Sequence, residues 1–300
     1  MTALRERMID AMAQRGFSPR THQSYLRAIV DLARYTRTPP DRLDSAQLVG
    51  YFHHLVQERH LAPASCRLHR EAVRFLYVQV LHRDDLALDI PLPKRPQRIP
   101  ELLSPSEVRR LLTASPNAKH RMLLATCYGA GLRVSEVVRL RVRDIDGEQG
   151  QLRIVQGKGR QDRLVPIGAT LLDELRSYWR RYRPKTWLFP GSPAERHLCI
   201  TSAQRAYRQA LARAGIDKVG GIHALRHAYA THQLAAGMPL HILQRLLGHR
   251  DLSATQRYLH WVPSALGEDG RHPGVADLLA GLPDPSAGAP PANDPLRARP

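Results

Sequence analysis

The chain has little cysteine and no long apolar run. Its three cysteines, Cys66, Cys127 and Cys199, are far apart in sequence and odd in number. This pattern excludes a disulfide framework and predicts reduced packing residues. The N-terminus lacks the apolar core of a signal peptide, and no stretch approaches the ~20 apolar residues of a membrane span. These absences predict a cytoplasmic protein with no membrane partner.

Metal-ligand spacing is also lacking, although the chain contains 15 histidines. No zinc-type pairing of cysteine with histidine occurs, and His223 with His227 forms an isolated i, i+4 pair among the histidines of the C-terminal region. We therefore expect neither a metal nor another cofactor. No internal repeat is evident.

Positive charge is what the chain has in excess. It carries 45 Lys and Arg against 27 Asp and Glu, which gives a net charge of +18 and a pI of about 10.7. The excess is about +6 over residues 1–100 and about +12 over residues 101–300. Such a balance favours a polyanionic partner, most simply nucleic acid. Two basic lobes suit a protein that surrounds a duplex, so double-stranded DNA is the expected partner.

The hydrophobic pattern predicts a mainly α protein with a small β-hairpin, an α+β fold in two domains. Residues 1–90 should form a helical domain, with helices near 3–15, 18–36, 44–59 and 63–82. The proline-rich stretch 91–100 reads as an extended linker. Residues 101–270 then form a second domain, in which β-rich runs at 151–156 and 162–167 flank a glycine-rich turn. Residues 271–300 contain a short apolar helix, Val275–Leu282, and a disordered tail.

The segment from His223 to Tyr258 carries groups suited to attacking a DNA phosphate. Arg226 lies three positions after His223, so both share one face of a helix that ends near Gly237. A second helix over 239–247 ends at Gly248, directly before His249. Arginine fits phosphate with two donors, histidine moves protons near neutral pH, and a tyrosine hydroxyl can act as nucleophile. The segment thus offers a phosphate clamp, proton carriers and a nucleophile.

Two further cations lie upstream. Arg133 stands after the Gly129/Gly131 turn, where a helix begins, and a cation there is disfavoured by the helix dipole unless an anion shares the site. Lys158 stands at the tip of the predicted hairpin and could donate a proton to a departing oxygen. Each residue alone has a simpler explanation. Tyr258 could be a packing residue, Arg133 a solvated surface residue and Lys158 an ordinary turn residue. Glu136, three positions after Arg133, could simply stabilise the first turn of its helix. The ordered set favours catalysis.

Three phrases resemble the tyrosine recombinases, also called the phage integrase family. They are Gly-Leu-Arg133-Val-Ser-Glu, His223-Ala-Leu-Arg226-His-Ala-Tyr-Ala-Thr, and Leu-Leu-Gly-His249-Arg-Asp-Leu-Ser-Ala-Thr-Gln-Arg-Tyr258. The resemblance covers roughly residues 3–262, with no additional N-terminal arm-binding domain. It implies a simple two-domain recombinase, with residues 1–90 as a helical core DNA-binding domain and residues 101–270 as the catalytic domain. All six family positions are filled.

The resemblance also implies a role for each position. Arg133 and Arg226 would clamp the scissile phosphate, and Lys158 would protonate the leaving 5′-oxygen. His223 would assist proton transfer and His249 would hydrogen-bond the phosphate. Tyr258 would attack and become linked to a 3′-phosphate. Because the covalent bond conserves phosphodiester energy, no ATP is required.

The function implied is site-specific recombination or integration, in a mobile element rather than in chromosome-dimer resolution, by a homotetramer assembled on DNA. The apolar stretch Val275–Leu282 would contact a neighbouring protomer or dock within its own chain. Two alternatives remain open: strand cleavage and relaxation like a type IB topoisomerase, and a non-catalytic DNA-binding regulator on the same fold.

Overall fold

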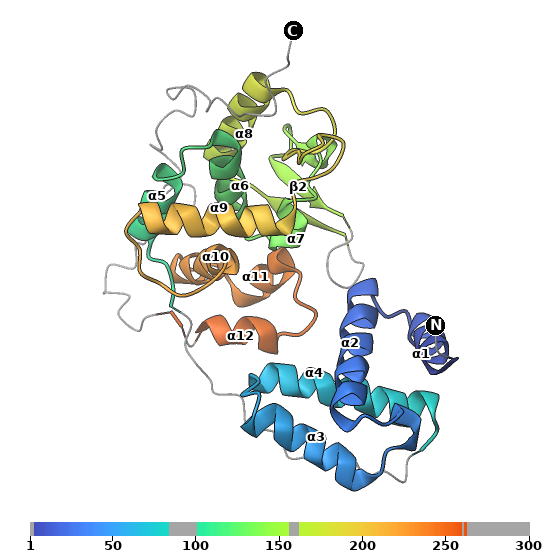
Figure 1. Ribbon diagram of the computed structural model, residues 1–300. Helices are drawn as coiled ribbons and strands as arrows, with labels where there is room; N and C mark the ends of the chain where they lie inside the picture. The colour runs from blue at the N-terminus through green and yellow to red at the C-terminus, as the bar shows by residue number, and fades with distance from the viewer. Residues whose placement is uncertain (1–2, 84–100, 156–161, 260, 263–300) are drawn as a thin grey trace. The chain divides into compact units, whose positions relative to one another are not determined.

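A computed structural model describes residues 3–83, 101–155, 162–259 and 261–262 (Figure 1). The chain divides into two compact units, residues 1–98 and 99–300. The expected linker 91–100, Lys158, the segment 271–300 and its stretch Val275–Leu282 lie outside the described residues.

The first unit is helical in its described part, and local capping explains where its helices begin. Ser18 accepts a hydrogen bond from the backbone of Thr21, and Asp44 forms a capping box with Gln47. The elements of this unit are α1 (Ala3–Gln14), α2 (Pro19–Thr36), η1 (Pro40–Arg42), α3 (Ser45–Gln57), α4 (Pro63–Arg74) and η2 (Phe75–Val80).

The last expected helix of this unit, 63–82, is present but does not stay α-helical. Its α-helical part ends at Arg74, and the wider π-helical segment η2 follows. The hydrophobic spacing could not reveal this change, because side chains on both segments face the same core. That core includes Met12, Leu32 and Tyr77, all fully buried.

The second unit combines helices with a small antiparallel sheet ordered β1-β2-β3. The expected hairpin is confirmed in β2 and β3, where Leu152 pairs with Val165; β1, which pairs with β2, was not predicted. The mainly α, α+β fold class is thus confirmed. The elements are α5 (Pro105–Thr113), α6 (Ala118–Gly129), α7 (Val134–Val137), η3 (Val142–Asp144), β1 (Ile145–Asp146), β2 (Gln151–Ile154), β3 (Arg163–Pro166), α8 (Ala169–Tyr182), α9 (Ile200–Arg213), α10 (His223–Ala235), α11 (Leu240–Leu247) and α12 (Ser253–Leu259).

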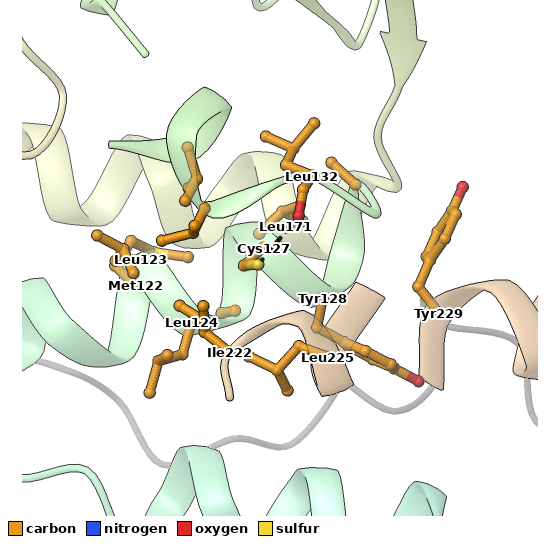
Figure 2. Packing of buried hydrophobic residues seen from close by; sticks show 14 of the residues in the cluster. Met122, Leu123, Leu124, Cys127, Tyr128, Leu132, Leu171, Ile222, Leu225 and Tyr229 are labelled. Atoms are coloured by element: carbon orange, nitrogen blue, oxygen red, sulfur yellow. Dashed lines mark hydrogen bonds between the residues drawn. The ribbon is translucent and has the colours of Figure 1, made fainter. Parts of the chain in front are cut away.

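Helix α6 forms the centre of the core of the second unit. Its residues from Met122 to Tyr128 are buried on every side, as expected of a helix surrounded by other elements. Figure 2 shows Leu124 and Cys127 of this helix near Ile222 and Leu225, which lead into and form part of α10. The buried helix α6 therefore packs directly against α10.

Of the three cysteines, Cys66 and Cys127 are the buried packing residues predicted, and all three are free. The prediction was wrong for Cys199, which is exposed and caps α9 by accepting a hydrogen bond from Ser202 N at 3.4 Å. No helix in the described part of the chain is both long and apolar enough to cross a membrane.

Candidate functional site

Arg226 projects from the first turns of α10 into the protein, where its side chain is 5% exposed. Its guanidinium donates to Gly131 O at 2.8 Å and to Leu247 O at 2.7 Å. It also lies 3.0 Å from His249 Nε2. Burial and the nearby charge of Arg133 lower its pKa to about 10, so Arg226 stays charged at neutral pH.

Two glycines allow the backbone around Arg226 to take this shape. Gly131 has φ +59°, and a Cβ there would lie 2.4 Å from the ring of Tyr229. Gly248 has φ +62°, a left-handed conformation, and ends α11 where the sequence predicted the end of this helix. These turns present carbonyls to the arginines, because Gly131 O binds Arg226 and Gly248 O accepts from Arg133 Nη2 at 3.2 Å.

Glu136 links two more arginines. Arg163 Nη1 and Nη2 bind its two oxygens at 2.9 and 2.8 Å, and Arg133 Nη1 binds Oε1 at 2.8 Å. Glu136 also accepts from Arg133 N, so it stabilises the first turn of α7 as expected. Its wider role was missed, because Arg163 lies 27 residues away on β3.

The arginine cluster, Arg133, Arg163 and Arg226, carries more positive charge than Glu136 neutralises. Three guanidinium groups face one carboxylate, a surplus of two positive charges among these four side chains, each at most 18% exposed. Buried charges are normally paired, because leaving water is costly. Such a surplus favours the binding of an anion, and the fork geometry of arginine suits phosphate.

The Glu136–Arg163 pair should contribute strongly to stability. Burial alone would raise the pKa of Glu136, but hydrogen bonds and charge from Arg163 and Arg133 outweigh it and lower the pKa to about 2. Because removing one partner of a buried ion pair costs about 3–5 kcal/mol, we expect Glu136→Gln to lower the free energy of unfolding by about that amount. Urea unfolding followed by tryptophan fluorescence measures this, since all three tryptophans lie in the second unit.

The pH dependence of the free energy of unfolding gives a second test of the Glu136–Arg163 pair. The folded-state pKa lies below the ordinary value of about 4.3, so the stabilisation is complete above that value and is lost as pH falls toward about 2. The stability difference between wild type and Glu136→Gln should therefore shrink over that range. Asp173→Asn is the control, because Asp173 pairs with Arg176 but is 71% exposed and should cost about 0–1 kcal/mol. Equal losses for both variants would contradict the prediction.

His249 is held between Arg226 and Thr255. Arg226 donates to Nε2, so Nδ1 carries the ring proton and donates to Thr255 Oγ1 at 2.8 Å. Burial and the charges of Arg226 and Arg133 lower the pKa of His249 to about 4, so it is neutral at pH 7. Thr255 is fully buried on α12, three residues before Tyr258. That spacing was the available signal for Thr255, which was not predicted.

Tyr258 is buried on α12, with 4% of the residue exposed. Burial raises its pKa above 10, although the nearby charges of Arg226 and Arg257 partly offset this. Its ring stacks parallel to that of His249 at 6.3 Å between centroids. Its Oη lies 3.0 Å from Nδ1 of His227, a residue that the sequence had indicated only as part of a weak metal pair.

The structure thus brings four of the six expected residues into one cluster of contacts: Arg133, Arg226, His249 and Tyr258. His223 is exposed at the first position of α10, where the charges of Arg226 and Arg133 still act on its ring. Within the described residues, no three side chains of the metal-binding types His, Cys, Asp and Glu lie close enough together to hold a metal ion.

Comparison with known proteins gives matches along most of the chain. Residues 101–264 match the phage integrase family, and residues 4–85 match the phage integrase N-terminal SAM-like domain. A putative integrase/recombinase, y4qK of Sinorhizobium fredii, is 42% identical over 260 residues, covering 86% of this chain and 84% of that protein. The tyrosine recombinase XerD of Yersinia pestis is 34% identical over 277 residues, covering 85% and 91%.

Solved structures show the same fold. XerH site-specific recombinase bound to palindromic difH substrate superposes with a TM-score of 0.68 at 20% identity, covering 86% of this chain and 81% of that chain. The Tn1549 transposon integrase in complex with transposon right end DNA gives a TM-score of 0.68 at 15% identity, covering 86% and 94%. Since the family match spans more than half of the chain and the sequence identity extends over most of it, this chain belongs to the phage integrase family and is a tyrosine-type site-specific recombinase.

Proposed function

We propose that this recombinase cuts and rejoins double-stranded DNA through a 3′-phosphotyrosyl intermediate at Tyr258. The observation that carries the proposal is the contact between a buried tyrosine and an arginine cluster with surplus positive charge. Arg226 acts on Tyr258 as a nearby positive charge, and His249 stacks on the tyrosine ring while binding Arg226. A phosphate bound by Arg226 would therefore lie close to the tyrosine oxygen.

In the proposed reaction, Arg133 and Arg226 bind the non-bridging oxygens of the scissile phosphate. On DNA binding the ring proton of His249 shifts to Nε2, which donates to the phosphate in place of its contact with Arg226, while Thr255 Oγ1 becomes the donor to Nδ1. His223 assists proton transfer, and Lys158 protonates the leaving 5′-oxygen. Fixed donors aimed at developing negative charge are strong contributors to catalysis, because they need no reorganisation during the reaction. Arg163 holds Glu136, which in turn holds Arg133, so Arg163 is a positioning residue here.

A nicked suicide substrate tests the proposal. It releases a short fragment on cleavage, so a covalent protein–DNA adduct should accumulate and resist denaturing electrophoresis. A non-catalytic regulator would bind the same DNA without forming an adduct. Two differently marked duplexes then distinguish the remaining alternative: a recombinase yields joined products, whereas a topoisomerase-like enzyme relaxes each duplex and joins none.

The proposed role of Lys158 as general acid predicts that a modified substrate restores cleavage by a Lys158 variant. A 5′-bridging sulfur makes a leaving group that hardly needs a proton, because a thiol has a far lower pKa than an alcohol. Lys158→Ala should therefore cleave the oxygen substrate about 10²-fold or more slowly and the sulfur substrate at nearly the wild-type rate. Single-turnover cleavage of both substrates measures this. Equal defects on both would make Lys158 a DNA-binding residue instead.

We further propose a homotetramer on DNA and a role in a mobile element. Exchange between two duplexes requires two protomers on each, and the net charge of +18 makes free protomers repel until DNA phosphates neutralise them. The mobile-element role is supported by the names of relatives: at 42% and 41% identity these are putative integrase/recombinases, whereas the XerD recombinases are at 34–35%. Sequencing the DNA bound in cells tests it, since sites at the ends of an element are expected.

A further inference from the structure

His227 is the residue of this region that the proposed mechanism leaves without a function. Its Nδ1 lies 3.0 Å from Tyr258 Oη. Its ring packs edge-to-face against Trp261 at 5.7 Å, and Trp261 packs in the same way against Tyr258 at 5.2 Å. Three aromatic rings from α10, α12 and the residues just after α12 therefore fix the imidazole relative to the tyrosine.

The direction of this hydrogen bond follows from the groups around it. Tyr258 keeps its proton at neutral pH, because burial raises its pKa above 10. The nearby Arg226 has only N–H donors and cannot accept that proton. Burial and neighbouring positive charge lower the pKa of His227 to about 4, so its ring is neutral and can accept. Nδ1 of His227 is thus the acceptor for the tyrosine O–H.

The charges facing His227 show when it can take up a proton. His223 and Arg226 lie on its own helix, Arg257 and Tyr258 lie on α12, and His249 precedes α12. The cations among them oppose an imidazolium in the DNA-free protein. A bound phosphodiester brings negative charge to Arg226, and an opposite charge nearby favours the protonated ring. DNA binding should therefore raise the basicity of His227.

We propose that His227 is a further catalytic residue, whose Nδ1 receives the phenolic proton of Tyr258 as Oη attacks the scissile phosphate. The inference rests on the proposed phosphotyrosyl reaction. In cleavage the Oη–P bond forms, the P–O5′ bond breaks, the phenolic proton moves to Nδ1, and the 5′-oxygen takes its proton from the general acid. In rejoining, the 5′-hydroxyl attacks phosphorus and gives its proton back to the general acid, the Oη–P bond breaks, and His227 returns its proton to Tyr258. No further reactant is required.

Two substitutions separate proton uptake from simple positioning. His227→Ala removes the acceptor, whereas His227→Asn places Oδ1 near the position of Nδ1 and keeps an acceptor that cannot hold a proton at neutral pH. Single-turnover cleavage of the suicide substrate is measured between about pH 6 and pH 9. Since general bases contribute about 10²–10⁴-fold, both variants should be at least about 10²-fold slower at neutral pH. Their rates should rise steeply with pH as hydroxide replaces the missing base, while the wild-type profile stays flatter.

His232→Asn is the matched control. His232 lies on the same helix, and its Nδ1 is 2.9 Å from the hydroxyl of Tyr128, a buried tyrosine that has no part in the proposed mechanism. It should leave the cleavage rate and pH profile close to wild type, and binding of intact target DNA should be similar for all variants. The 5′-bridging sulfur substrate adds a second control. It should restore the cleavage rate of Lys158→Ala but not that of His227→Ala. The sulfur removes the need to protonate the leaving group, whereas His227→Ala lacks the acceptor for the proton of the attacking tyrosine.

Three results would overturn the inference: His227→Ala cleaving within about threefold of wild type, His227→Asn restoring the wild-type rate and pH profile, or the sulfur substrate rescuing His227→Ala. If the wild-type protein forms no adduct at all, the proposed phosphotyrosyl function fails, and this inference fails with it. The adduct assay on wild type therefore distinguishes the two failures.

Discussion

Tyr258→Phe is expected to abolish the covalent protein–DNA adduct while leaving DNA binding close to wild type. The substitution removes the one oxygen that the proposed reaction links to phosphorus, and phenylalanine fills nearly the same buried space against Trp261. The arginine cluster, which should supply much of the binding to the target phosphate, is unchanged. Adduct yield on the suicide substrate and binding to an intact duplex measure the two properties separately.

Tyr128→Phe is the control for this prediction. It also removes a buried hydroxyl that meets a histidine Nδ1, here that of His232, so it reproduces the loss of one tyrosine–histidine hydrogen bond. It should form the adduct normally. An adduct of normal yield with phenylalanine at position 258 would show that another residue is the nucleophile.

Arg226→Lys should lower the cleavage rate about 10²–10³-fold, the usual effect of losing one transition-state donor. Arg226 places its donors on two carbonyls and His249 at once, and a lysine offers a compact ammonium that cannot span these positions. The positive charge is kept, so a loss of this size would identify geometry rather than charge as the requirement. Single-turnover cleavage at saturating protein measures the effect.

Arg245→Lys on α11 is the matched control, because Arg245 is exposed and should tolerate the change. Tryptophan fluorescence of both variants verifies that the second unit remains folded. Cleavage by Arg226→Lys within about threefold of wild type would place Arg226 outside the reacting site.

Much of the secondary structure could be predicted because its causes are local. Ser104 and Glu107 form a capping box three residues apart at the start of α5, and Gly248 takes the left-handed conformation that ends α11. The paired runs around the glycine-rich turn form β2 and β3. The π-helical segment after Arg74 was not predicted, because it depends on the packing of both segments against one core.

The family, the order of the expected site residues and the excess of positive charge could be predicted from the sequence, since each can be read from neighbouring residues and composition. The contacts between atoms of the site depend on tertiary packing. Arg226 binds the carbonyl of Gly131, 95 residues away, Arg163 binds Glu136 across 27 residues, and His227 rather than His223 contacts Tyr258. Such contacts depend on how α7, β3 and α10–α12 pack, and no local pattern encodes which of two nearby histidines faces the tyrosine oxygen. The residue types of the site could therefore be predicted from the sequence, while the contacts between them depend on packing.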